Sequence, residues 1–255
     1  VLSAMIKAVV FDIYGTLVKS EDGDLDNSLN KKEKQITIIR QLNEAYGISE
    51  DPKETFEAFK KAINDEHKRK RLEGIEYPEV VIEEIWHTVL PISKQAAKEY
   101  AYEFYDAAGK RELYSNAKEL IDCLQSSGIV CGIMSNAQFY TIEDMKRILG
   151  EERYTLFATD LCIFSYQEGY SKPNPLLFSK LSAALKKRNI LPKETLFVGN
   201  HALKDVKAAQ NSSLKGCLFK SDEVVEDISV KPDFTITDLI EVKTIIKQVN
   251  DGHAA

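Results

Sequence analysis

Hydrophobic and polar positions follow different rhythms in successive parts of this chain. Residues 9–11 (Val-Val-Phe) form an apolar run without polar alternation, which is typical of a strand buried on both faces. From about Lys34 to Ala108, apolar residues recur every three or four positions and no strand-like run interrupts them. This stretch therefore predicts four helices inserted behind the first strand.

From Ser115 onward the rhythm changes to helix and strand in alternation. The predicted strands cover residues 129–134, 161–164, 195–198, 216–219 and 234–236, and the predicted helices cover 116–127, 137–149, 175–187, 203–211 and 238–249. Repeated strand–helix units imply a parallel sheet with helices on both faces. We therefore predict a core domain of residues 5–18 and 112–255, with an inserted α-helical domain of residues 19–111 that covers its crevice.

A single carboxylate stands at the end of the first predicted strand. Asp12 is followed by a glycine turn and by the hydroxyl of Thr16. A charge placed there lies in the crevice that open α/β sheets use for ligands, and its burial costs several kcal/mol unless a cation meets it. The alternative is a turn aspartate that caps the next segment.

Polar residues also follow the later core strands. Ser135 and Asn136 end one strand, where they could donate hydrogen bonds to an anion or act as an ordinary helix cap. Lys172 precedes a proline-started helix, the unfavourable end of the dipole for a cation, so it is either paired with a negative group or exposed on a loop. Asp205 is either a second site carboxylate or an acid in the first turn of a helix. Together these residues fit a carboxylate nucleophile, a bound anion and a divalent cation.

The four motifs resemble, in order and spacing, those of the haloacid dehalogenase-like (HAD) hydrolase superfamily. The first motif corresponds to Asp12-Ile-Tyr-Gly-Thr16, the second to Ser135, the third to Lys172-Pro173 and the fourth to Gly199-Asn200-xxxx-Asp205. The match covers the whole predicted core. The resemblance implies an α/β fold, with a Rossmann-like parallel sheet flanked by helices on both faces and an inserted helical cap domain.

The resemblance also implies a role for each matching residue. Asp12 would be the nucleophile, and Lys172 would neutralise charge between it and the substrate. The anionic group would be held by Thr16 and Ser135, and the rest of the substrate by Tyr14, Asn136 and Asn200. The ligands of Mg²⁺ would be Asp12, Asp205 and the main-chain carbonyl of Tyr14. A carboxylate approaching a phosphate oxygen at ~4 Å meets a repulsion of about 4 kcal/mol per charge pair at an effective dielectric near 20. A lysine and a divalent cation offset that repulsion.

Two positions depart from the phosphatase pattern of the family. Tyr14 stands where phosphatases carry a general acid–base aspartate, and the L-2-haloacid dehalogenase branch has tyrosine there. A phenol with a pKa near ~10 is a poor proton donor at neutral pH. Asn200 stands where phosphatases commonly have an acidic metal-site residue, although its spacing from Asp205 follows the phosphatase form.

We therefore predict a hydrolase with a covalent aspartyl intermediate that acts on a small phosphorylated metabolite. The first alternative is a metal-independent L-2-haloacid dehalogenase, and the second is a non-catalytic binding module that has kept the fold. In the insert, Arg40 is either the arginine that dehalogenases use against the halide or a solvated helix residue. Tyr77 and Trp86 either face the substrate or belong to the core of the insert.

Composition and charge narrow the partners. The net charge is −6, and the one basic run, residues 67–72, is flanked by acids, so nucleic-acid binding is not expected. The four cysteines show no CxxC pairing and the four histidines are scattered, which predicts neither disulfides nor zinc. No apolar stretch approaches ~20 residues, so no membrane span is expected. We expect Met5 to be the native start and residues 252–255 to form a frayed tail. The expected location is the cytoplasm and the expected partner is a small anionic substrate, while the oligomeric state stays open.

Overall fold

The computed structural model describes residues 4–20 and 29–252 and divides the chain into two compact units. The first unit comprises Val1–Lys19 and Arg111–Ala255, and the second comprises Ser20–Lys110. The second unit is thus inserted between Lys19 and Arg111 of the first unit. Residues 1–3 and 253–255, which hold most of the segments predicted to precede the native start and to fray, lie outside the described residues.

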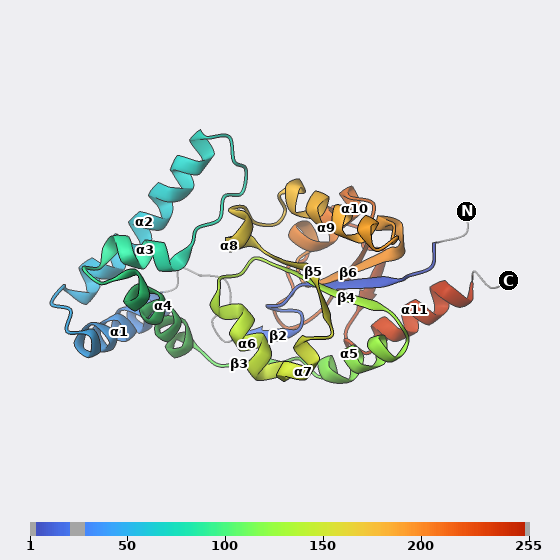
Figure 1. Ribbon diagram of the computed structural model, residues 1–255, viewed down its shortest axis with the longest axis horizontal. Helices are drawn as coiled ribbons and strands as arrows, with labels where there is room; N and C mark the ends of the chain where they lie inside the picture. The colour runs from blue at the N-terminus through green and yellow to red at the C-terminus, as the bar shows by residue number, and fades with distance from the viewer. Residues whose placement is uncertain (1–3, 21–28, 253–255) are drawn as a thin grey trace. The chain divides into compact units, whose positions relative to one another are not determined.

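Alternating strands and helices build the first unit (Figure 1). The strands are β1 (Ala8–Phe11), β2 (Val18–Ser20), β3 (Arg111–Leu113), β4 (Val130–Ser135), β5 (Phe157–Phe164), β6 (Thr195–Gly199), β7 (Lys215–Phe219) and β8 (Phe234–Ile236). The helices are α5 (Ala117–Ser126), α6 (Tyr140–Leu149), α7 (Glu151–Tyr154), α8 (Ser165–Glu168), α9 (Pro175–Lys187), α10 (Ala208–Asn211) and α11 (Glu241–Asp251), with short 3₁₀ and π-helical turns at Pro192–Glu194 and Ala202–Lys207.

Six of these strands form one parallel sheet in the order β5-β4-β1-β6-β7-β8. The strand that carries Asp12 at its end, β1, lies in the middle, between β4 and β6. The carboxyl ends of parallel strands meet at one edge of the sheet, where open α/β sheets bind ligands. The predicted α/β fold is therefore confirmed, and the strand ends named in the sequence share this edge.

Side chains of the central strand alternate between two hydrophobic clusters. Val9 and Phe11 pack into the cluster formed with α5 and α11, whereas Ala8 and Val10 pack into the cluster formed with α9 and α10. Figure 1 shows these two pairs of helices on opposite sides of the sheet. This double burial explains why β1 reads as a continuous apolar run.

Several segments differ from the sequence prediction, among them α11, which covers Glu241–Asp251 rather than 238–249. β5 begins at Phe157 rather than 161, because the exposed residues 159–160 in its middle hide the strand pattern. α6 begins at Tyr140 rather than 137. The predicted helix 203–211 is a π-helical turn followed by the four-residue α10, although its apolar spacing is helical. The short elements β2, β3, α7 and α8 had too few residues to show a period.

The second unit consists of the four predicted helices. They are α1 (Leu29–Tyr46), α2 (Pro52–Leu72), α3 (Ile82–Val89) and α4 (Lys94–Ala108). Aromatic side chains form their common core: the rings of Phe59 and Trp86 are stacked with centroids 4.0 Å apart, and Tyr100 and Phe104 pack against Trp86 at 4.8 and 5.2 Å. None of the helices in the described part of the chain is long and apolar enough to cross a membrane.

Candidate active site

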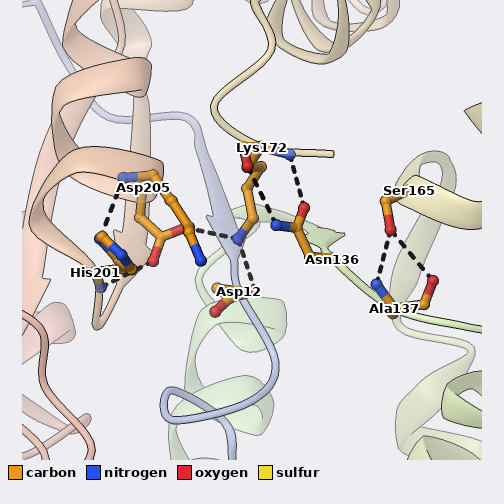
Figure 2. Close-up of polar contacts among 8 residues, drawn as sticks. Asp12, Asn136, Ala137, Ser165, Lys172, His201 and Asp205 are labelled. Atoms are coloured by element: carbon orange, nitrogen blue, oxygen red, sulfur yellow. Dashed lines mark hydrogen bonds and ion pairs between the residues drawn. The ribbon is translucent and has the colours of Figure 1, made fainter. Parts of the chain in front are cut away.

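Three charged side chains from distant parts of the sequence meet at the carboxyl edge of the sheet. Asp12 directly follows β1, and its N–H donates to the carbonyl of Val198 in β6 at 2.9 Å. Lys172 lies in the loop before α9, and its Nζ donates to Asp12 Oδ1 at 2.7 Å and to Asp205 Oδ1 at 2.6 Å. Figure 2 shows the lysine ammonium between the two carboxylates. Lys172 therefore has the negative partners that its place before a helix N-terminus predicts.

This cluster is almost completely removed from solvent. The exposed fractions of the side chains are 10% for Asp12, 3% for Lys172 and 1% for Asp205. Burial raises the pKa of Asp12, and the neighbouring Asp205 adds to the rise, whereas Lys172 opposes it. Burial lowers the pKa of Lys172, but both aspartates raise it and the net shift is upward. Two carboxylates against one ammonium leave an unbalanced negative charge in a buried place.

A tight turn after β6 positions Asp205. A Cβ atom on Gly199 would lie 2.4 Å from the Asp205 carboxylate, so only glycine permits this approach. Asp205 lies in the π-helical turn, and its Oδ2 accepts from the His201 N–H at 3.0 Å. The His201 ring caps the same turn, because its Nδ1 accepts from the N–H groups of Leu203 and Lys204 at 3.3 Å each. Sequence reasoning missed this cap, although a polar residue just after a strand and its glycine turn is its usual signal.

Two buried hydroxyls at this edge have no hydrogen-bond partner. Thr16 is fully buried and Ser135 is 2% exposed, and within residues 4–20 and 29–252 nothing bonds to Thr16 Oγ1 or Ser135 Oγ. Thr16 lies in the turn after Asp12, and Ser135 ends β4, the strand adjacent to β1. Buried hydroxyls without partners cost about 1–3 kcal/mol each, and a ligand with oxygen acceptors at this edge would supply the partners that they lack.

The side chain of Asn136 is engaged by the main chain of Lys172. Asn136 Oδ1 accepts from the Lys172 N–H at 2.7 Å, and Asn136 Nδ2 donates to the Lys172 carbonyl at 3.2 Å (Figure 2). Ser165, which the sequence did not single out, supports the next residue: its Oγ accepts from the Ala137 N–H at 2.9 Å and donates to the Ala137 carbonyl at 3.2 Å. Both contacts fix the loops that carry Ser135 and Lys172.

Tyr14 and Asn200, the two departures from the phosphatase pattern, also have protein partners. The Tyr14 hydroxyl lies 2.9 Å from Thr141 Oγ1 on α6. Asn200 Nδ2 donates to the carbonyl of Glu223 at 2.7 Å. The role in substrate binding predicted for Tyr14, Asn136 and Asn200 stays a prediction.

The residues of the second unit that the sequence singled out fall into two groups. Trp86 is fully buried in the aromatic core described above, so of the two predicted possibilities, substrate contact or core of the insert, it takes the second. Tyr77 is 49% exposed and Arg40 is exposed as well.

The family model of the haloacid dehalogenase-like hydrolases matches residues 6–212, most of the chain. This chain belongs to the haloacid dehalogenase-like hydrolase family. The resemblance drawn from the four motifs is therefore confirmed, and the protein is an enzyme of the HAD type.

Curated relatives include both a phosphatase and a protein of unspecified substrate. The chain is 30% identical over 143 residues to a glyceraldehyde 3-phosphate phosphatase of Pyrococcus furiosus, an alignment that covers 55% of this chain and 56% of the relative. It is 26% identical over 222 residues to a hydrolase of Schizosaccharomyces pombe, covering 81% and 87%. The chain thus matches little more than half the length of the phosphatase.

Solved structures of both branches share the fold. A 2-haloacid dehalogenase from Pseudomonas syringae pv. Tomato superposes with a TM-score of 0.66 at 19% identity, covering 96% of this chain and 99% of that one. A HAD phosphatase from Thermococcus onnurineus gives 0.61 at 18%, covering 94% and 98%. A HAD hydrolase from Bacillus subtilis, whose structure holds magnesium, gives 0.56 at 18%, covering 95% and 99%. At this identity the similarity concerns the fold alone.

The potential ligand atoms of this HAD site are oxygens, the atom type that hard divalent cations prefer. Mg²⁺ prefers oxygen ligands and commonly takes one or two carboxylates from the protein. Asp12 and Asp205 supply two carboxylates close enough to share the Lys172 ammonium. Tyr14, whose main-chain carbonyl is the third predicted ligand, lies two residues after Asp12. Over the described ranges, no group of three or more His, Cys, Asp or Glu side chains is arranged to hold a metal. A cation at this site would therefore depend on the two aspartates together with non-acidic oxygens.

Proposed function

We propose that this enzyme hydrolyses the phosphate ester of a small metabolite through a phosphoryl-aspartate formed at Asp12. The observation that carries the proposal is a pair of buried hydroxyls, Thr16 Oγ1 and Ser135 Oγ, which have no hydrogen-bond partner among the described residues. They lie at the same sheet edge as the buried cluster of Asp12, Lys172 and Asp205. Hydroxyl donors at this edge suit the oxygens of a bound phosphoryl group. The spacing of Asn200 and Asp205 and the phosphatase among the curated relatives support the same substrate class.

Each charged residue has a distinct part in the proposed reaction. A carboxylate oxygen of Asp12 bonds to phosphorus as the bond to the leaving alcohol breaks, and the departing alkoxide takes a proton from water. A water molecule then attacks the phosphorus, which releases inorganic phosphate and restores the Asp12 carboxylate. Lys172 neutralises charge between nucleophile and substrate, while Thr16 and Ser135 donate to the phosphoryl oxygens. Because Tyr14 replaces the usual acid–base aspartate, we expect slower turnover with poor leaving groups.

Charge balance favours a metal-assisted form of this reaction. A phosphate monoester would bring nearly two negative charges to a cluster that already carries an excess of one. We propose that Asp12, Asp205 and the Tyr14 carbonyl hold Mg²⁺, which when bound supplies positive charge against the phosphoryl oxygens. We further propose that Ser20–Lys110 acts as a cap domain, and that the enzyme acts in the cytoplasm.

One observation favours a second candidate function, L-2-haloacid dehalogenation. Tyr14 is the residue that this branch carries after its nucleophile, and its hydroxyl is already held by Thr141. In this reaction Asp12 would attack carbon, halide would leave, and water would then hydrolyse the resulting ester. A haloacid carries a single negative charge, so no metal is required.

A substrate panel separates the candidates. Purified protein is incubated with phosphate monoesters and with L-2-haloacids, each with Mg²⁺ or with EDTA, and released phosphate and halide are assayed. The proposal predicts phosphate release that EDTA abolishes. Halide release in EDTA would establish the dehalogenase, and absence of turnover on both panels would contradict the proposed function and favour the binding module. A single turnover in ¹⁸O-water also shows which atom the water attacks. Hydrolysis of a phosphoryl-aspartate at phosphorus puts the label into phosphate, whereas hydrolysis of the dehalogenase ester at its carbonyl puts the label into Asp12.

A further inference from the structure

A serine outside all four motifs contacts the turn that follows the nucleophile. Ser221 lies just beyond β7, and its Oγ donates to the carbonyl of Gly15 at 2.8 Å. The same Oγ accepts from the N–H of Glu223 at 3.3 Å. Ser221 is 9% exposed, so this bond is largely shielded from water. The hydroxyl therefore joins the loop after β7 to the turn that carries Tyr14 and Thr16.

Asn200 holds the same turn from another direction. Gly15 has a φ of 76°, and a Cβ atom there would lie 2.1 Å from Asn200 Nδ2, so the Asn200 amide packs directly against the Gly15 backbone. The side-chain amide of Asn200 donates to the main-chain carbonyl of Glu223 at 2.7 Å. The main-chain carbonyl of Asn200 accepts from the Val225 N–H at 2.9 Å. We call residues 221–225 the brace segment, because they contact both Gly15 and Asn200.

Further polar contacts join the brace segment to Tyr114 and Lys19. The Tyr114 hydroxyl donates to Asp222 Oδ1 at 2.6 Å and to Glu223 Oε1 at 3.1 Å. Lys19 forms an ion pair with the other oxygen of Asp222. Lys19 and Tyr114 lie in or next to β2 and β3, which pair with each other. The side chains of Asp222 and Glu223 thus hold the brace segment next to β2 and β3.

We propose that Ser221, acting with Asn200, is a positioning residue that sets the turn at Gly15, and with it Thr16 and the Tyr14 carbonyl, relative to Asp12. This inference rests on the proposed catalytic role of that turn. It also accounts for the amide at residue 200. A carboxylate there could not donate to the Glu223 carbonyl, so asparagine is the residue that both packs against Gly15 and bonds to the brace segment.

The test compares Ser221→Ala with Ser229→Ala. Ser229 is an exposed serine of the same loop whose hydroxyl donates to Asp227, two residues away, so it is a matched control. Turnover is measured on whichever substrate class the wild-type enzyme accepts, p-nitrophenyl phosphate with Mg²⁺ or L-2-chloropropionate. We expect Ser221→Ala to lower kcat by about tenfold with KM within about twofold, because small displacements of catalytic groups are costly.

A second readout does not depend on turnover. Hydrogen–deuterium exchange of the peptide covering residues 13–18 is expected to accelerate in Ser221→Ala and to match wild type in Ser229→Ala, with thermal midpoints of all three proteins within a few degrees. The inference requires both changes; a Ser221→Ala protein with wild-type kcat, or with unchanged exchange in residues 13–18, would overturn it. Failure of the proposed function is distinguishable, because there the wild-type enzyme itself releases no phosphate.

Discussion

Two buried clusters, one in each unit, show opposite uses of a protein interior. The aromatic cluster of the second unit, centred on Trp86, is apolar and closely stacked. The cluster at the edge of the sheet is just as buried but consists of Asp12, Lys172 and Asp205. Burying an aromatic side chain favours folding, whereas burying ions costs several kcal/mol per group before their mutual attraction is counted.

The two clusters therefore serve different purposes: the aromatic cluster stabilises the second unit, whereas the charged cluster of the first unit adds little to stability beyond what the hydrophobic clusters on either side of the sheet provide. A charged cluster with an unbalanced negative charge, near two hydroxyls that find no partner in the described part of the chain, is a poor way to stabilise a fold. It is a good way to receive an anion together with a cation. Removing an aromatic ring should therefore affect folding, and removing the nucleophile should affect activity without harming the fold.

The largest effect is expected for Asp12→Asn. An amide cannot act as the nucleophile, so kcat should fall by at least about 10³-fold. Unfolding in urea should show no loss of stability, because the change removes a buried carboxylate whose pKa is raised by burial. Asp160→Asn, at an exposed ion pair with Arg188, serves as the control and should keep wild-type turnover. Normal turnover of Asp12→Asn would remove Asp12 from the mechanism.

Trp86→Ala should show the reverse pattern in the second unit. Deleting a fully buried ring that stacks on Phe59 should lower the free energy of unfolding by about 3–5 kcal/mol. Leu72→Ala, at a residue 82% exposed in the same unit, should change it by less than about 0.5 kcal/mol. Chemical denaturation followed by circular dichroism measures both. Equal stabilities of the two variants would show that Trp86 is not part of a core.

Lys172→Met should destabilise the protein in a pH-dependent way. It leaves two buried carboxylates without their cation, and about 3 kcal/mol of stability should be lost near pH 8 in EDTA. Without the ammonium the pKa of Asp12, already raised by burial, should rise further above its unfolded value. A raised carboxyl pKa favours the folded state at low pH and ceases to do so as pH rises through it, so stability should recover toward about pH 5.

The control for this pH dependence is Lys61→Met, which breaks a solvent-exposed pair with Asp65. Its free energy of unfolding should change by less than about 1 kcal/mol. If Lys172→Met were as stable at the higher pH as at the lower one, the carboxylates would not depend on Lys172.

Asn200→Asp should give a smaller loss, of about tenfold in kcat. The substituted carboxylate cannot donate a hydrogen bond to the Glu223 carbonyl, and its negative charge is repelled by that oxygen. Asn189→Asp, at an exposed residue of the same unit, should leave kcat unchanged. Steady-state assays over a range of Mg²⁺ concentrations decide the matter. Higher activity of Asn200→Asp with a lower Mg²⁺ requirement would mean that residue 200 serves the cation rather than the brace segment.

Sequence patterns could predict the charged cluster because parallel strands bring their carboxyl ends to one edge. Asp12 directly follows a buried strand, and Asp205 follows another buried strand and its glycine turn. Lys172 lies at the unfavourable end of a helix dipole, which allowed either a negative partner or an exposed position. The alternation of strands and helices from Ser115 onward likewise predicted the sheet, and the uninterrupted helical spacing of residues 34–108 predicted the four inserted helices. Boundaries were missed where polar residues interrupt a strand, as in β5.

Other features depend on contacts that no local pattern shows. The clamp of Asn136 on the Lys172 main chain and the bond from Ser221 to Gly15 join residues 36 and 206 positions apart. The π-helical turn that carries Asp205 has the apolar spacing of an ordinary helix. For Trp86 the sequence allowed a substrate contact or a core position, and only packing against Phe59 decided between them.

The most direct measurement is chemical trapping of the intermediate. Enzyme mixed with an accepted phosphate ester and Mg²⁺ is quenched in acid within one turnover, treated with borohydride, digested and analysed by mass spectrometry. A phosphoryl-aspartate is reduced by borohydride, so the account predicts homoserine at residue 12 in wild type and an unmodified peptide in Asp12→Asn. An unmodified Asp12 in wild-type samples that have released phosphate would contradict it, because water would then attack the substrate directly.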